Sequence, residues 1–284
     1  MKYIKLFPIV FGLIGIFILY SAGGNLDSIS LSEGKIVLPI NSNRIDRIKE
    51  KGNSVNEVAL SFFLPTSTTG QIVNHDYYTL SYNEKSEQAE WVAYELKKNY
   101  IKKNNFKRPF FIEDPKVITR SADWRNFKKS GFDKGHLCPA GDMQFNKKAY
   151  DDTFYTSNIA PQDRAFNGGI WNRLEQKVRY WAEKYDGVFV VTGGVLAPSL
   201  KTIGKERVAV PEFFYKVVLD NSRGNFKMIA FLIPNKKSEK PLYDFVVSVD
   251  RIEGMTGIDF FPALDDKIGN ELEKSTDYRS WLSK

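Results

Sequence analysis

Three apolar runs between residues 188 and 235 constrain the fold more than any other part of this chain. They read VFVVTGGVL, RVAVPEFFYKVVLD and FKMIAFLIPN, and they are rich in Val, Ile and Phe. Residues of these types favour β-strands, and two or three of these strands are expected to be well buried. Because helical patterns flank the runs, we expect an α+β protein with a mainly antiparallel central sheet flanked by helices.

The clearest helical pattern covers residues 167–187, NGGIWNRLEQKVRYWAEKYDG. Gly187 is expected to close this helix. Its apolar side chains fall on one stripe: Trp171, Leu174, Val178, Trp181 and Tyr185. The other expected elements are helices at 86–101, 248–257 and 271–282, a strand at 75–83, a long loop at 106–135, and a helical turn followed by a strand at 147–162.

Cysteine and histidine are scarce, with one Cys and two His in 284 residues. The single cysteine, Cys138, excludes an intrachain disulfide and a Cys-rich zinc site, and two histidines nearly exclude a multi-His metal site. A catalytic metal would therefore be held mainly by oxygen atoms, which favours a hard cation such as Mg²⁺, Mn²⁺ or Ca²⁺. We interpret Cys138 itself as a small buried residue.

The charge balance is moderately basic. The chain has 41 Lys and Arg against 34 Asp and Glu, which gives a net charge of +7 and a pI near 9.2. This excess is compatible with a polyanionic partner such as nucleic acid. Many basic proteins bind no polyanion, so the charge alone does not decide the function.

The amino terminus reads MKYIKLFPIVFGLIGIFILYSAGGN. Two lysines precede an apolar run at 6–19, which is typical of a signal peptide; an uncleaved membrane anchor is the alternative. The run lacks arginine and has little serine, which argues against a mitochondrial transit peptide. We therefore expect an exported protein, either secreted or periplasmic, or tethered to the membrane. Its expected parts are a leader at 1–22, a linker and packing arm at 23–70, and a folded domain at 71–284.

One of the two histidines lies in GFDKGHLCPAGDM, residues 131–143. His136 could pack, hold a metal or move a proton. Because an imidazole can be neutral near physiological pH, a histidine in a polar segment punctuated by Gly and Pro suits a general base. The other histidine, His75, begins an apolar strand-like run and is expected to be structural.

Asn167, Trp171, Glu175 and Arg179 are spaced four residues apart on the predicted helix. On a regular helix they climb one side, and each step turns by about 40°. Asn167 would then lie at the positive end of the helix dipole, which suits an anion or the oxygen shell of a hydrated cation. The alternative is an ordinary N-cap at Asn167 and a surface ion pair between Glu175 and Arg179.

Three ordered blocks of residues together resemble a known family, the DNA/RNA non-specific endonucleases. These are the ββα-metal nucleases, which include the endonuclease G type. The stretches YYTLSYN, EWVAYEL, VTGG and VDRIEGMTGIDFFPAL are also similar to this family, so the resemblance covers about residues 75–265. It implies a ββα-metal motif and makes 71–284 the nuclease domain. The blocks are Asp133, Lys134, Gly135 and His136; Ser157, Asn158, Pro161 and Gln162; and Asn167, Trp171, Leu174, Glu175 and Arg179.

The resemblance implies roles for the residues around the metal ion. His136 would be the general base, and Asn167 would be the one direct protein ligand of a Mg²⁺ ion, with Mn²⁺ or Ca²⁺ as alternatives. Glu175 would orient a water molecule beside the ion.

The resemblance also implies roles toward the nucleic acid. Arg108, Lys134 and Arg179 would neutralise charge that develops on the phosphate. Asp133, Asn158 and Gln162 would contribute to substrate binding, and Asp133 is expected to fix the hairpin backbone rather than act as a base.

Lys134 departs from the family pattern, which usually has arginine at this position. Lysine keeps the charge but loses the two-pronged hydrogen bonding of a guanidinium. The sequence predicts a metal-dependent, sugar-non-specific endonuclease that hydrolyses phosphodiester bonds in DNA and RNA. The alternatives are a catalytically weakened nucleic-acid-binding protein on the same fold and a phosphodiesterase of another substrate class.

Overall fold

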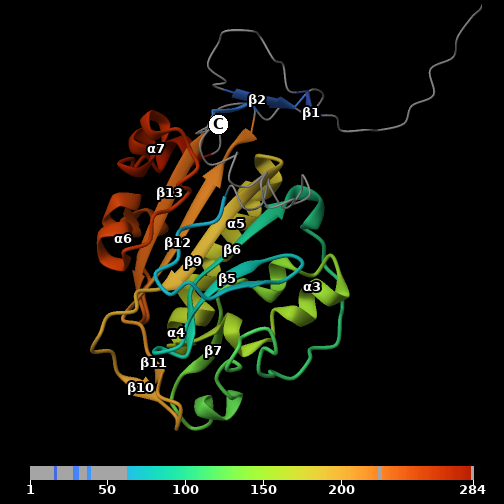
Figure 1. Ribbon diagram of the computed structural model, residues 1–284, viewed down its shortest axis with the longest axis vertical. Coiled ribbons are helices and arrows are strands. Elements are labelled where there is room, and N and C mark those ends of the chain that lie inside the picture. Colours follow the sequence, from blue (N-terminus) through green and yellow to red (C-terminus); the bar gives the residue numbers. More distant parts are fainter. Residues whose placement is uncertain (1–15, 18–27, 32–36, 40–62, 223–225, 283–284) are drawn as a thin grey trace, which may run out of the picture.

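The computed structural model describes residues 16–17, 28–31, 37–39, 63–222 and 226–282 (Figure 1). The first three ranges form a small antiparallel sheet of β1 (Ile16–Phe17), β2 (Ser28–Leu31) and β3 (Val37–Pro39). Apart from β1, the predicted leader at 1–22 lies outside the described residues. The division into leader, arm and nuclease domain therefore stays a prediction.

A seven-stranded sheet forms the centre of the protein (Figure 1). Its strand order is β14-β13-β12-β9-β6-β5-β4, and every neighbouring pair is antiparallel. The three apolar runs form β9, β12 and β13, which confirms the α+β fold with an antiparallel central sheet. The strands are β4 (Ile72–Asn74), β5 (Thr79–Asn83), β6 (Gln88–Lys97), β9 (Gly187–Gly194), β12 (Phe213–Asp220), β13 (Lys227–Pro234) and β14 (Val246–Val247).

Helices cover both faces of this sheet. One hydrophobic core joins the sheet to α3 (Lys147–Asp152), α4 (Arg164–Phe166) and α5 (Asn172–Lys184). The other joins it to α6 (Val249–Thr256) and α7 (Asp266–Glu273), which lie together beside β13 in Figure 1. Two short pairs of strands lie outside the central sheet: β7 (Asp133–His136) with β8 (Ile159–Gln162), and β10 (Thr202–Ile203) with β11 (Val208–Ala209). The 3₁₀ turns are η1 (Lys98–Tyr100), η2 (Trp124–Phe127), η3 (Ala140–Asp142), η4 (Thr156–Asn158), η7 (Leu242–Phe245) and η8 (Arg279–Trp281).

The central strands supply side chains to both cores, because successive residues of a strand face opposite sides of the sheet. Phe214 and Val218 of β12 belong to the core beneath α5, whereas Val217 and Leu219 belong to the core beneath α6. Since both faces are buried, the strand sequence is continuously apolar instead of alternating.

The helix predicted at 86–101 is wrong, because residues 88–97 form the ten-residue strand β6. Val92 and Leu96 of β6 face the core beneath α5, and Trp91 faces the opposite core. A strand buried on both faces has apolar residues at odd and even positions, and this pattern also satisfies a helical spacing. Glu87 has a φ of 53° in the turn that joins β5 to β6, so the chain reverses where the helix was expected to begin.

The helix predicted at 167–187 is confirmed from Asn172 onward, but its beginning differs. Residues 167–171 form a π-helical turn, η5 (Asn167–Trp171), in which Gly169 has non-helical dihedral angles. The four-residue spacing from Asn167 to Glu175 therefore does not lie along one regular helix. The helix predicted at 271–282 also differs, because α7 begins earlier and ends at Glu273, and η8 follows separately.

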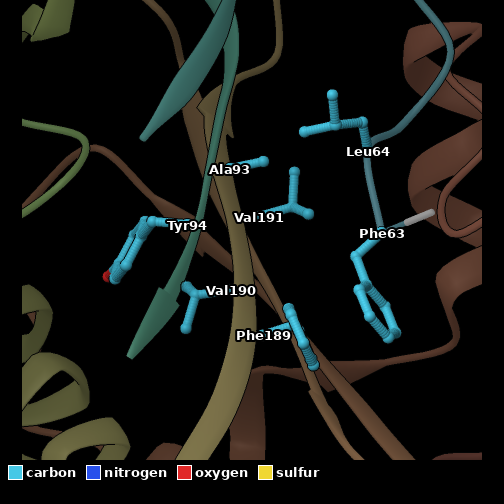
Figure 2. A pocket seen from close by; sticks show the side chains of 7 residues that line it. All are labelled: Phe63, Leu64, Ala93, Tyr94, Phe189, Val190 and Val191. Atoms are coloured by element: carbon cyan, nitrogen blue, oxygen red, sulfur yellow. The ribbon is translucent and has the colours of Figure 1, made fainter. Parts of the chain in front are cut away.

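Residues 63–69 pack against the sheet on the side of α6. The rings of Phe63 and Phe189 stack with their centroids 3.6 Å apart, and Figure 2 shows Phe63 and Leu64 facing β6 and β9. The void between them is only about 10 Å³, which is too small to hold a ligand. Glu90 of β6 accepts a hydrogen bond from the backbone nitrogen of Thr68 (2.9 Å), which holds this segment on the sheet.

Candidate active site

The GFDKGH segment, predicted as the end of a loop, forms the strand β7 and pairs with β8 in an antiparallel hairpin. Asp133 lies opposite Gln162 and His136 lies opposite Ile159. Gly135 is required between them, since a Cβ at this position would come within 2.5 Å of Gln162 Cγ and nearer still to Cδ and Oε1. Because α4, η5 and α5 follow β8 directly, the chain forms the two strands and helix that the sequence predicts.

His136 is half-buried between two aromatic rings. Its ring centroid lies 5.6 Å from that of Phe111 and 5.0 Å from that of Phe154. Nε2 is buried and has no hydrogen-bond partner within the described residues. Burial, and after it the nearby Arg108 cation, lower the pKa of His136 to about 3. The imidazole is therefore neutral near pH 7 and has a nitrogen that can accept a proton.

Two cations gather at the same aromatic pair. The guanidinium carbon of Arg108 lies 5.4 Å from the Phe111 ring centroid and 5.3 Å from that of Phe154. The Lys134 ammonium lies 5.3 Å from the Phe111 centroid. The structure thus brings Arg108, which precedes the first of the three blocks of motif residues by 25 positions, to the side of His136. Two positive side chains beside a neutral imidazole suit the binding of a phosphate group.

Asp133 and Asn167 form the link between the hairpin and η5. Asn167 Nδ2 donates to Asp133 Oδ2 (3.2 Å), and its backbone nitrogen donates to the carbonyl oxygen of Asp163 (2.8 Å). Asp163 also accepts from the nitrogens of Ala165 and Phe166, so it is the N-cap residue of α4, and the alternative interpretation of Asn167 as the N-cap does not apply. With its nitrogen held by Asp133, the Asn167 amide offers its oxygen, Oδ1, and a carboxylate lies beside it. This oxygen donor set fits a hard cation such as Mg²⁺.

Glu175 belongs to a half-buried cluster of charged side chains beneath α5. Burial raises its pKa to about 7; the Lys216 and Arg179 cations act in the opposite direction, and Asp142 adds to the effect of burial. Arg179 donates to Asp142 Oδ1 (2.5 Å), and the hydroxyl of Tyr94 donates to Asp142 Oδ2 (2.9 Å). The carboxyl group of Glu175 is therefore poised between its two protonation states near neutral pH.

Sequence reasoning missed Asp142 and Lys216 as members of this cluster. Lys216 interrupts the apolar run EFFYKVVLD, and a lysine inside a buried strand was a visible signal. Asp142 stands within the motif itself, but nothing in GDM indicates its pairing with Arg179.

Three of the residues with predicted roles toward the nucleic acid are held inside the protein by hydrogen bonds or burial. Asn158 is fully buried, accepts from the backbone nitrogen of Cys138 (2.8 Å) and donates to the carbonyl oxygens of Cys138 and Thr153. Its amide is therefore fully used in fixing the end of the hairpin. Gln162 is equally buried, beneath Gly135. Arg179 pairs with Asp142, so in this structure its guanidinium holds the cluster together.

The second histidine is structural, as expected. His75 Nε2 lies 2.8 Å from Asp114 Oδ2, both side chains are buried, and the ring stacks on Tyr78 with a centroid distance of 4.5 Å. Cys138 is also buried, as expected, and burial raises the pKa of its thiol well above the usual range. A neutral thiol at physiological pH is not a nucleophile.

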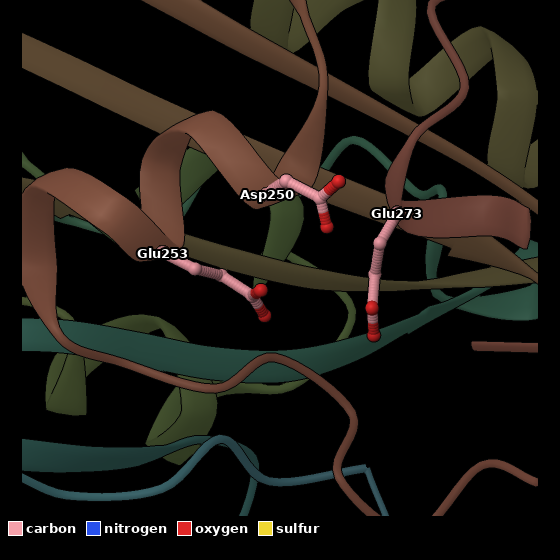
Figure 3. A group of neighbouring side chains, drawn as sticks. All are labelled: Asp250, Glu253 and Glu273. Atoms are coloured by element: carbon pink, nitrogen blue, oxygen red, sulfur yellow. The ribbon is translucent and has the colours of Figure 1, made fainter. Parts of the chain in front are cut away.

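A group of carboxylates outside the motif lies close enough to share a cation. Within the described residues, Asp250 and Glu253 of α6 and Glu273 of α7 have carboxylate oxygens within 4.8 Å of one another, and Figure 3 shows them turned toward a common space. These helices cover the face of the sheet opposite to α5. The group therefore contributes nothing to the site around His136 and Asn167.

Comparisons with known proteins agree with this architecture. The family model for DNA/RNA non-specific endonuclease matches residues 57–267. Nuclease EXOG, mitochondrial, of Danio rerio is 38% identical over 240 residues, covering 78% of this chain and 69% of that protein. Human Endonuclease G, mitochondrial, is 33% identical over 215 residues, covering 70% and 72%. A crystal structure of the EndoG/EndoGI complex superposes with a TM-score of 0.69 at 29% identity and covers 76% of this chain and 94% of that chain.

The relatives overturn the expectation of an exported or membrane-tethered protein. The Danio rerio and human proteins are named mitochondrial nucleases, not secreted or periplasmic ones. No helix within the described residues has the length and apolar content needed to cross a bilayer. The prediction failed because cellular receptors read targeting segments, and two lysines before an apolar run do not specify which receptor reads them.

Two kinds of similarity converge on the same part of the chain. The matched range includes the β7–β8 hairpin, η5 and α5, which carry His136, Asn167 and Glu175. The relatives exceed 30% identity over more than two thirds of this chain. This chain therefore belongs to the DNA/RNA non-specific endonuclease family, a family of metal-dependent enzymes that hydrolyse phosphodiester bonds.

Proposed function

We propose that this enzyme cleaves DNA and RNA at the surface formed by the β7–β8 hairpin and η5, with His136 as the general base. The observation that carries this proposal is the buried Nε2 of His136, which has no partner and lies beside the Arg108 cation. An unpartnered acceptor in a buried position costs free energy, which is common where catalysis needs the group. A water molecule that attacks phosphorus would pass its proton to this nitrogen.

Arg108 and Lys134 are proposed to bind the phosphate whose bond is broken. Both cations lie against the Phe111 ring, which in turn lies beside the His136 imidazole. Charge on the non-bridging oxygens increases as the water attacks, so cations fixed in advance stabilise the transition state more than the ground state. Binding through phosphate also accounts for the lack of base specificity, because the backbone carries no direct sequence information.

Asn167 is proposed to be the protein ligand of the divalent cation, which we take to be Mg²⁺, with Mn²⁺ or Ca²⁺ as alternatives. The amide oxygen is presented by the hydrogen bond from Nδ2 to Asp133, so Asp133 acts by orienting Asn167. When bound, the cation supplies positive charge that stabilises the phosphate oxygens and the leaving alkoxide. Glu175 is proposed to accept a hydrogen bond from a water molecule at the site; its ionised form can do so with either carboxylate oxygen.

The decisive experiment compares duplex DNA, single-stranded RNA and a small phosphodiester as substrates, with Mg²⁺ present and with Mg²⁺ chelated. We expect Mg²⁺-dependent cleavage of both nucleic acids at internal positions. Binding of nucleic acid without cleavage would support the non-catalytic alternative instead. Cleavage of the small diester alone would point to another substrate class.

A further inference from the structure

Lys216 is the most unusual buried group of the described chain. It lies on β12 between Phe214 and Val218, on the face of the sheet that packs against α5. The residue is fully buried, and its ammonium has no hydrogen-bond partner within the described residues. Its ammonium lies over the ring of Trp171, at 4.9 Å from Nζ to the centroid. An ammonium removed from water without hydrogen bonds is costly, and such groups cluster at functional sites.

The charged and titratable groups that act on Lys216 lie on α5, on η3 and in the segment after β7. They are Glu175 and Arg179 of α5, Asp142 of η3, and Cys138 after β7; Tyr94 of β6 completes the cluster through Asp142. Burial lowers the pKa of Lys216, and the strongest opposing influence is Glu175, ahead of Asp142.

The two acids of this cluster differ in their partners. Asp142 accepts from Arg179 at 2.5 Å and from Tyr94 at 2.9 Å, so its two oxygens are both occupied. The Glu175 carboxylate makes no hydrogen bond to any described side chain or backbone group, and Lys216 is the cation with the largest effect on it. Arg179 is thus matched with Asp142, which leaves Lys216 as the counter-charge of Glu175.

We propose that Lys216 is a positioning residue for the cleavage reaction, and that its buried ammonium increases the ionised share of the Glu175 carboxylate near neutral pH. This inference rests on the proposed function of Glu175. Lys216 does not touch substrate, because the residue is fully buried beneath Trp171 and α5. It acts through the charge state of Glu175 alone.

The balance around Glu175 is sensitive to the loss of one charge. Burial already raises the pKa of Glu175 to about 7, and Lys216 is the first of the two cations that oppose this. Without Lys216 the carboxyl group would be mostly protonated at pH 7, and a protonated Glu175 cannot serve as a pure acceptor for water.

The first test measures this coupling in metal-free protein. The carboxyl stretch of Glu175, assigned by its loss in Glu175→Gln, is followed by infrared spectroscopy against pH in wild type and in Lys216→Met, an apolar replacement of similar length. We expect the titration midpoint of Glu175 to rise by about one pH unit or more in Lys216→Met. Val218→Ala, on the same face of β12, should leave the midpoint unchanged although it destabilises the fold. An unchanged midpoint in Lys216→Met would overturn the proposal.

The second test separates kcat from KM on one duplex substrate. Lys216→Met should lower kcat at pH 7 about tenfold, leave KM within about twofold, and move the acidic limb of the pH profile upward. Adding Lys216→Met to Glu175→Gln should cost nothing further, because the residue acts only through that carboxylate. Additive losses, or a loss in KM alone, would refute this role.

Failure of the proposed function gives a different result. If wild type did not cleave nucleic acid, the kinetic test would fail while the infrared midpoint still moved. Folding is controlled by the double variant Glu175→Gln/Lys216→Met, which removes both buried charges and should melt at or above the temperature of wild type. A double variant that melts well below wild type would show that Lys216 serves the fold instead.

Discussion

Replacing Gly135 with alanine should disrupt the active site from inside the hairpin. The new methyl group would come within 2.5 Å of Gln162 Cγ and nearer still to two other atoms of the same side chain. Gln162 is fully buried, so it cannot swing into solvent, and either its side chain or the hairpin must move. Overpacking of this kind costs about 1–3 kcal/mol, which corresponds to a fall in Tm of about 4–8 °C for a mid-range cost in a chain of this size.

The effect on catalysis should exceed the effect on stability. Gly135 stands between Lys134 and His136 in β7, so a shift of the strand moves both groups. A displacement of about 1 Å can lower kcat about 100-fold. The assay is kcat on duplex DNA with Mg²⁺, together with a thermal melt. Gly254→Ala is the matched control, because its Cβ meets nothing within 4 Å and it lies inside a helix, so it should keep full activity.

Truncating Gln162 should rescue the variant. Gly135→Ala/Gln162→Ala gives the methyl group the space of the missing side chain, and it also removes two buried polar atoms that have no hydrogen-bond partner. We expect the double variant to regain most of the lost stability and kcat. If Gly135→Ala alone were as stable and as active as wild type, the close packing of this hairpin would not hold Lys134 and His136 in place.

Four further predictions concern single groups. His136→Ala should lower kcat by about 10²- to 10⁴-fold and leave nucleic-acid affinity, measured with Mg²⁺ chelated, largely intact; substantial residual turnover would remove His136 from the mechanism. Asp133→Ala should raise the Mg²⁺ concentration for half-maximal activity about 10- to 100-fold, as Asn167→Ala should also do, because the amide loses its orientation; an unchanged requirement for Mg²⁺ in both would exclude this metal site. At fixed salt, kcat/KM of Lys134→Arg should equal or exceed that of wild type, and kcat/KM of Lys134→Ala should be lower than that of wild type. An alanine variant as fast as wild type would show that Lys134 binds no phosphate. Burial and the neighbouring acids of Figure 3 raise the pKa of Glu273 from 4.5 to about 7. The folded state therefore binds this proton more tightly than the unfolded state, and the free energy of unfolding falls as pH rises from about 4.5 to 7. Glu273→Gln should raise Tm at pH 8 and not at pH 4, whereas the same change at the exposed Glu271 should raise Tm at neither pH.

The strands of the sheet differ in how far the sequence could predict them. β9, β12 and β13 were predictable because each is a compact run of Val, Ile and Phe bounded by Gly, Pro or Asp. β6 was not, since Trp91 and Val92 face opposite cores and the resulting pattern fits a helix equally well. Which of the two forms is decided by pairing with β5 and β9, and this pairing is not encoded in the local pattern.

For the active site, the sequence predicted which residues come together but not their individual hydrogen bonds. Motif spacing predicted the residues that meet at the hairpin, including Arg108, because a shared motif reflects a shared geometry. The spacing of the motif residues could not show that the Asn158 amide is hydrogen-bonded to the backbone or that Arg179 donates to Asp142. The π-helical turn at Asn167 was also hidden, because a pair of glycines is compatible with several backbone paths.

The strand order of the central sheet has a consequence for self-association. Four of its five inner strands, β6, β9, β12 and β13, are eight to ten residues long, whereas the outermost strands β4 and β14 have three and two residues. An edge strand this short exposes few unpaired backbone groups of its own to a second molecule. On one side, however, β14 pairs with only Ala230 and Phe231 of β13, so this side of the sheet is the one more open to edge-to-edge pairing.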